Sequence, residues 1–124
     1  MSTKAAEVTK IAVNCFLTTK ISYANMLGQV LTLSGMEDEI DNVLKSIGSD
    51  DRIGKKYLKY GFGFGGPCFP KDVSALIEFS KEIGYELSLL KKANIINNSI
   101  RAQYNDLTSR EKEQNIKYNS DEEE

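Results

Sequence analysis

The sequence predicts an all-α domain built on one long central helix, with shorter helices packed around it. Apolar residues recur at helical spacing over several long stretches, and no stretch shows the alternation that is typical of a strand. Both prolines, Pro67 and Pro70, lie in one loop, so that no helix elsewhere is interrupted. The 124 residues are enough for one domain.

The long helix is expected over residues 5–33, with two adjacent apolar stripes. One stripe is Ala12, Phe16, Thr19, Tyr23, Met26, Val30 and Leu33. The other is Val13, Leu17, Ala24, Leu27 and Leu31. Such a helix is ~42 Å long, and a single small domain can hardly cover both stripes over that length. We therefore expect a homodimer that forms through the long helix.

Three shorter helices should follow. The first, over 37–47, turns Ile40, Val43, Leu44 and Ile47 inward, and residues 49–60 are basic and turn-like. The next begins at Pro70 or Lys71 and runs to Ile83, where Gly84 closes it. The last, over 87–107, carries the stripe Leu89, Ala93, Ile96, Ile100, Tyr104 and Leu107. This places the helical domain at 1–107 and a polar, acidic, disordered tail at 108–124.

Composition excludes several classes of function. The net charge of −2 gives no electrostatic case for binding nucleic acid or a membrane surface, and no apolar run reaches the ~20 residues of a membrane span. Histidine is absent, which removes the commonest general base and metal ligand. Cys15 and Cys68 form neither a CxxC pair nor a zinc-ligand spacing, so we expect no metal site, free thiols and a cytoplasmic location.

The most informative segment is the glycine-rich loop over 61–72, which delivers Cys68 to the start of a helix. A helix amino terminus stabilises a thiolate, and glycines let the backbone approach a ligand closely. Cys68 is therefore a candidate nucleophile, and the alternative is a small buried apolar residue. The same glycines match GxGxxG, but the basic segment before them is not a buried strand, so a dinucleotide-binding fingerprint is rejected.

Other polar residues have both a functional and a structural interpretation. Lys10, Asn14 and Thr18 form a row on one face of the long helix, which is either part of a site or a solvated face. Asp72 lies one turn after Cys68, where it either positions water or compensates the helix dipole. Arg52 and Lys59 flank the loop and either bind an anion or are surface charges, and Cys15 is interpreted as core.

These residues, in this order, resemble the UDP-glucose/GDP-mannose 6-dehydrogenase family, over its central dimerisation domain. The resemblance covers residues 7–106 and is most specific in two segments, Asp51-Arg52-Ile53-Gly54 and Gly65-Gly66-Pro67-Cys68-Phe69-Pro70-Lys71-Asp72. It implies oxidation of the C6 alcohol of a nucleotide sugar to a uronic acid, with two NAD⁺, through a cysteine thiohemiacetal and thioester.

The resemblance also implies roles for single residues. Cys68 corresponds to the catalytic cysteine, Lys10 to an oxyanion-stabilising lysine, Asn14 to a substrate and oxyanion donor, and Asp72 to a carboxylate that helps activate water. Arg52 corresponds to an arginine that reaches the neighbouring subunit's substrate site. Tyr57, Lys59 and Gly65 lie where the family contacts the nucleotide sugar, with Tyr57 in place of a commoner Phe.

Family enzymes are about three times longer, because Rossmann-like domains bind NAD and UDP on either side of this domain. We expect no NAD binding and no activity from this chain alone, and the NAD- and UDP-binding parts could be separate chains. Three functions stay open: part of a split or excised enzyme, a non-catalytic dimerisation module, or a thiol-redox protein. No second cysteine near Cys68 supports the third.

Overall fold

The computed structural model describes residues 1–64 and 68–103, except for the side chain of Cys68. It contains α1 (Thr3–Leu33), a short 3₁₀ turn η1 (Glu37–Glu39), α2 (Ile40–Gly48), α3 (Cys68–Glu82) and α4 (Ser88–Gln103). Within these ranges there is no strand, so the all-α prediction is confirmed. None of the helices described is both long enough and apolar enough to cross a membrane.

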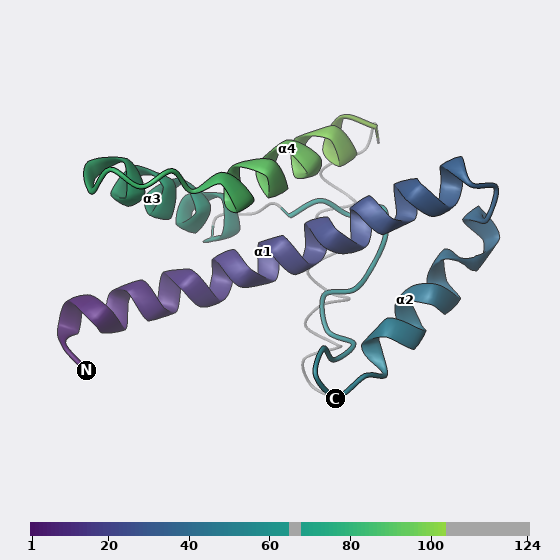
Figure 1. The fold of residues 1–124 in the computed structure, drawn as a ribbon, viewed down its shortest axis with the longest axis horizontal. Helices are drawn as coiled ribbons and strands as arrows, with labels where there is room; N and C mark the ends of the chain where they lie inside the picture. The colour runs from purple at the N-terminus through teal and green to yellow at the C-terminus, as the bar shows by residue number, and fades with distance from the viewer. Residues whose placement is uncertain (65–67, 104–124) are drawn as a thin grey trace.

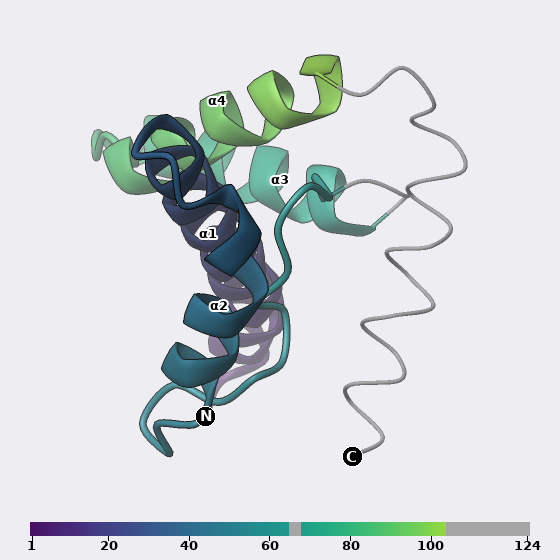
Figure 2. The same ribbon diagram turned by 90° about the vertical axis from the view of Figure 1, so that its right-hand side faces the viewer.

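Helix α1 is the spine of the molecule. Helices α3 and α4 pack along one side of it, and α2 folds back from its carboxyl end on another side (Figure 1). The view in Figure 2 shows α3 and α4 together above α1, with α2 below. Most of the packing of the short helices is therefore against α1, and α3 and α4 also touch each other.

The ends of α1 follow from local chemistry. The Ser2 hydroxyl accepts a hydrogen bond from the Ala5 N–H at 3.1 Å, which starts the helix two residues before the predicted Ala5. At the other end Gly35 has a φ of 79°, and the Met36 N–H donates to the Leu31 carbonyl at 2.8 Å. This is a glycine-terminated helix end, as predicted from Gly35.

Helix α2 covers the carboxyl-terminal part of the second apolar stripe of α1, whereas Val13 at its other end is 54% exposed. Ile40 and Leu44 are buried against Ala24 and Leu31, in a cluster that also contains Leu58. The inward face predicted for this helix is therefore confirmed. The expectation that one small domain can hardly cover both stripes agrees with the structure, because α2 folds back onto one end of the second stripe and the first stays open.

Helix α3 begins at Cys68, two residues before the earliest predicted start. Pro70 is thus the third residue of the helix, where an N–H would have no partner within the helix, so that proline is tolerated. The helix ends as predicted, since Gly84 has a φ of 77° and the Tyr85 N–H donates to the Ser80 carbonyl at 2.9 Å.

The stripe predicted for the last helix is wrong at its start. Leu89 is 72% exposed, and α4 instead buries Leu90, Ala93, Asn97 and Ile100. Because Asn97 is buried, the buried face of α4 lies one residue away from the face that the apolar pattern predicts. The expected residues 104–107 of this helix and the tail at 108–124 lie outside the described residues.

Helix α1 differs from an ordinary amphipathic helix on both of its faces. The face toward α3, α4 and the glycine loop buries polar side chains beside Ile21, with Thr18, Ser22 and Asn25 at most 1% exposed. The first predicted stripe lies on the opposite face and is open: Phe16 is 68% exposed, Tyr23 50%, Met26 41%, Val30 51% and Leu33 87%. An open apolar row of this length on a folded domain is typical of an interaction surface.

Candidate active site

Asn14 and Asp72, which are 58 positions apart in sequence, meet at the centre of the predicted site. The Asn14 Nδ2 on α1 donates a hydrogen bond to the Asp72 Oδ2 on α3 at 2.6 Å, and both side chains are partly buried. A charge-assisted bond of this kind fixes the orientation of both groups. For Asn14 the alternative of a solvated face is therefore wrong, and the same holds for Thr18, which is fully buried.

Cys15 lies beside this pair and has the environment of a structural cysteine. It is 5% exposed, and its Sγ is 3.6 Å from the main-chain carbonyl oxygen of Asp72, to which the thiol donates. Burial, and secondly the charge of Asp72, raise the pKa of the Cys15 thiol from 9.0 to about 11. The interpretation of Cys15 as core is confirmed, and its thiol is protonated at neutral pH.

The other two catalytic candidates are placed only in outline. Cys68 is the first residue of α3, exactly four positions before Asp72, and Lys10 lies one turn before Asn14 on α1, with an exposed side chain. Gly65 lies outside the described residues. The backbone of Cys68 thus starts the helix whose first turn also carries Asp72, the partner of Asn14.

Two buried asparagines hold the loop that leads to Cys68. The Asn25 Nδ2 donates to the Phe62 carbonyl at 2.9 Å, and its Oδ1 accepts from the Gly61 N–H at 2.9 Å. On α4, the Asn97 Oδ1 accepts from the Phe64 N–H, and its Nδ2 donates to the Phe64 carbonyl at 3.0 Å. Each side-chain amide thus satisfies buried backbone groups that no strand partner takes.

Sequence reasoning missed the role of both asparagines. Asn25 belongs to neither of the two apolar stripes predicted on the long helix, and Asn97 lies outside the stripe predicted for the last helix. The signal was present, because Asn97 stands at helical spacing between Ala93 and Ile100, and a polar residue in a buried row must have a partner.

The glycines of the loop have structural reasons that differ from those of a phosphate-binding fingerprint. Gly61 has a φ of 93°, which favours glycine. A Cβ at Gly63 would meet the Asn97 Oδ1 at 2.6 Å and the side chain of Arg101, so that only glycine lets Asn97 approach the backbone. The rejection of a dinucleotide fingerprint agrees with this, since residues 55–60 include no strand.

Tyr57 is a buried residue in a strained conformation. Its φ is 67°, which is rare for an aromatic residue, and it is 7% exposed. Its ring makes an edge contact with Phe69, the second residue of α3, at 6.3 Å between centroids. Tyr57 therefore supports the first turn of the cysteine helix, in addition to any contact with a substrate.

Arg52 and Lys59 differ in their surroundings. The Arg52 side chain is 88% exposed and pairs with Asp50, with the Nη2 2.7 Å from the Oδ2 and the Nε 3.0 Å from the Oδ1. Lys59 is half-buried. The hydrogen bonds that the structure describes for Arg52 go to Asp50 and not to Asn14 or Asp72.

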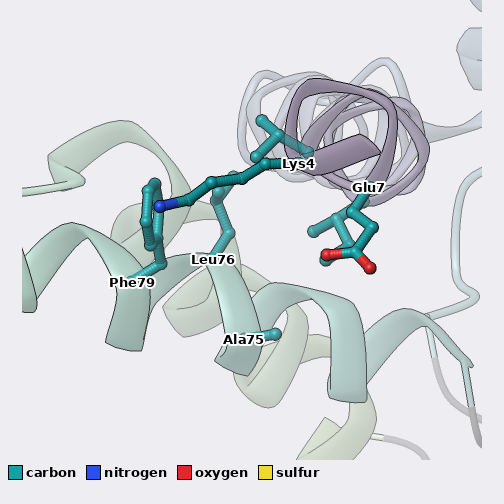
Figure 3. Close-up of a pocket in the computed structure, with 7 residues that line it drawn as sticks. Lys4, Glu7, Ala75, Leu76 and Phe79 are labelled. Atoms are coloured by element: carbon teal, nitrogen blue, oxygen red, sulfur yellow. The ribbon is translucent and has the colours of Figure 1, made fainter. Parts of the chain in front are cut away.

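Two hollows in the described surface flank the site. One, of about 710 Å³, lies beside Tyr57 and is lined by Phe16, Leu17, Lys20 and residues 53–57. The other, of about 160 Å³, lies between α3 and the start of α1, where Lys4 reaches across to the ring of Phe79 (Figure 3). Lys10, Asn14 and Asp72 line neither of these two hollows, whereas Tyr57 lines the first.

The fold and this site define a class: an all-helical domain in which an asparagine–aspartate pair joins the long central helix to the first turn of a helix that begins at a cysteine. The sequence profile described as the UDP-glucose/GDP-mannose dehydrogenase family, central domain, matches residues 4–99. The chain belongs to this family.

Individual relatives agree. The chain is 43% identical over 88 residues to the UDP-glucose 6-dehydrogenase TuaD of Bacillus subtilis, which covers 71% of this chain and 19% of the relative. It is 46% identical over 92 residues to the UDP-glucose 6-dehydrogenase AglM of Haloferax volcanii, covering 74% and 21%.

A solved UDP-glucose dehydrogenase from Pyrobaculum islandicum matches with a TM-score of 0.75 and 39% identity, over 80% of this chain and 22% of that one. The chain thus spans about a fifth of the length of these relatives.

Proposed function

We propose that this chain supplies the cysteine-bearing helical domain of a UDP-glucose 6-dehydrogenase, which oxidises the C6 alcohol of a nucleotide sugar to a uronic acid. The observation that carries the proposal is the Asn14–Asp72 hydrogen bond of 2.6 Å, in the same first turn of α3 that begins with Cys68. The family membership supports the substrate class, since the relatives named above are UDP-glucose dehydrogenases.

Each catalytic candidate has a defined task in this proposal. The Cys68 thiolate adds to the C6 aldehyde carbon, and the new C–S bond leaves an oxyanion that becomes the hydroxyl of a thiohemiacetal. The Asn14 amide and the Lys10 ammonium stabilise negative charge on that oxygen. After oxidation to the thioester, Asp72 orients a water molecule whose attack breaks the C–S bond and returns the thiol, releasing the acid.

The oxidation steps need a hydride acceptor, which is NAD in the proposed reaction. The described residues do not fit NAD, because they contain no strand on which a dinucleotide fold could be built, and the glycines at 61 and 63 serve the turn and the Asn97 contact. We derive no hydride step from this chain, and propose that NAD- and UDP-binding domains act with it, from this chain's own longer form or from separate chains.

A two-fold dimer through α1 completes the proposal. The open apolar row of Phe16, Tyr23, Met26, Val30 and Leu33 is the surface that a second copy would cover. Arg52 is exposed and makes its described ion pair only with Asp50, so it can exchange this partner for an anion bound to the neighbouring subunit.

The same apolar row favours a second function, a dimerisation module without catalysis. A domain exchange distinguishes the two. We expect a full-length UDP-glucose 6-dehydrogenase whose central domain is replaced by residues 4–99 to reduce NAD with UDP-glucose, and its Cys68→Ser form to be inactive. The 124-residue chain alone should form no NADH.

A folded, dimeric exchange protein that is inactive with Cys68 intact would contradict the catalytic proposal and favour the module. NADH formation by the chain alone, lost in Cys68→Ser, would contradict the need for other domains.

A further inference from the structure

We propose that Asn97 and Asn25 are positioning residues for Cys68: their side-chain amides hold the incoming backbone so that the first turn of α3 stays helical from Cys68 onward. This inference rests on the proposed function, in which Cys68 is the nucleophile. It adds two residues that touch neither substrate nor cofactor in that proposal and act through the backbone alone.

The start of α3 is the reason that such support is needed. Local sequence signals start this helix at Pro70 or Lys71, yet it begins at Cys68. Tertiary contacts can supply what the local signals do not, and the ring of Phe69, the second residue of the helix, packs against Tyr57. If the helix began at Pro70, Cys68 would lie before it and would lose most of the favourable interaction with the helix terminus.

The described contacts fix the chain on both sides of residues 65–67. Downstream, Phe69 packs edge-on against Tyr57, and Asp72 accepts from Asn14. Upstream, Asn97 holds both backbone groups of Phe64, which is 1% exposed.

Asn25 holds the upstream chain two residues earlier, through Gly61 and Phe62. Both amides are buried, with Asn25 at 0% and Asn97 at 2% exposure.

The amide of Asn97 mimics a neighbouring strand for one residue. It accepts from the N–H and donates to the carbonyl of Phe64, which fixes the extended direction of the backbone as it approaches α3. The contact is specific to glycine at position 63, since a Cβ there would displace the Asn97 oxygen. Gly63 in the loop and Asn97 on α4, which are 34 positions apart in sequence, thus act together to hold the backbone of Phe64.

The test is the pH dependence of Cys68 alkylation by iodoacetamide in the full 124-residue chain, with Cys68 and Cys15 separated by peptide mapping. In Asn97→Ala we expect the pH midpoint to rise by about 0.5–1 unit and the rate at neutral pH to fall by about three- to tenfold, as thiolate stabilisation is lost. A mere change in access would alter the plateau rate and leave the midpoint in place.

Gly63→Ala tests the same contact from the other side, because it leaves the amide in place and blocks its approach. We expect the same direction of shift. If Asn97→Ala loses its helical circular dichroism, Gly63→Ala still tests the proposal. The third variant is Asn25→Ser, which retains a small polar group. Lys10 on α1, Lys71 and Asp72 on α3 and Arg101 on α4 keep their charges in all three variants. Gly63→Ala also displaces the Arg101 side chain, so a shift that Asn97→Ala shares is the one that reports the amide contact.

Two controls match the perturbation. Ser22→Ala removes a buried hydrogen bond of 3.0 Å to the Ala93 carbonyl, which joins α1 to α4 without touching the loop. Asn98→Ala removes the exposed asparagine next to Asn97. Both should leave the Cys68 midpoint unchanged.

The outcomes separate the two proposals. If Cys68 of the native chain is alkylated with a low pH midpoint, and neither Asn97→Ala nor Gly63→Ala raises that midpoint, the positioning role is overturned while the proposed function stands. A shift as large in Ser22→Ala would show a general loosening, and would also overturn it. If Cys68 of the native chain is alkylated with the pH midpoint of an ordinary cysteine, the proposal that Cys68 is an activated nucleophile is itself overturned.

Discussion

Truncation of Phe16 should weaken the proposed dimer strongly. Phe16 is 68% exposed on the open row of α1. A buried phenylalanine removes roughly 200 Å² from water, so about 130 Å² of this side chain is available to a partner. At ~25 cal/mol per Å² this is about 3 kcal/mol for each copy. Phe16→Ala should therefore raise the dimer dissociation constant by about 100-fold or more.

Sedimentation over a micromolar concentration range measures this constant. Leu89→Ala is the matched control, because Leu89 is 72% exposed but lies on α4, away from the open row. We expect it to leave the dissociation constant within about twofold of the native value. A native chain that is a folded monomer at these concentrations, or equal effects of both substitutions, would refute the inference from the open row.

Two further predictions concern stability. Gly28→Ala should lower the free energy of unfolding in urea by up to about 2 kcal/mol although alanine favours helix, because a Cβ there overlaps the Tyr60 ring. The double variant Gly28→Ala with Tyr60→Leu should recover most of this loss. A Gly28→Ala variant that is more stable than the native chain would contradict the packing of Tyr60 against Gly28. The native chain should also lose up to about 3 kcal/mol between pH 9 and 11 relative to Cys15→Ala. The Cys15 pKa rises from 9.0 to about 11 on folding, so the unfolded chain loses this proton first, and the stabilisation is full below pH 9; equal pH profiles for both proteins would contradict this.

The fold was largely predictable because its signals are local. The 3–4 spacing of apolar residues, Gly35 and Gly84 as helix ends, and the prolines at 67 and 70 set the four helices. The predicted start of α3 is two residues late, and the first turn that the prediction misses or shortens has tertiary contacts with Tyr57 and Asn14. Local propensity carries no information about such contacts.

The pairing within the site was less accessible. Helical spacing placed Lys10 and Asn14 on one face of α1, but only the packing of α3 against α1 brings Asp72 to Asn14. The family resemblance supplied these roles, which spacing left open. Asn97 was missed because an apolar pattern ignores polar residues that find buried partners, and such partners are backbone groups of a distant loop.

The central claim is that Cys68, and not Cys15, is the nucleophile of this domain, and competitive alkylation tests it most directly. The Cys15 pKa is raised to about 11, whereas an ordinary cysteine titrates near ~8.5, so at neutral pH the thiolate fraction of Cys15 is roughly 300-fold below that of an ordinary thiol. With limiting iodoacetamide and peptide mapping, we expect Cys68 to be labelled at least about 100-fold faster, and Lys10→Ala to slow it. Labelling of Cys15 first, or at an equal rate, would contradict the account.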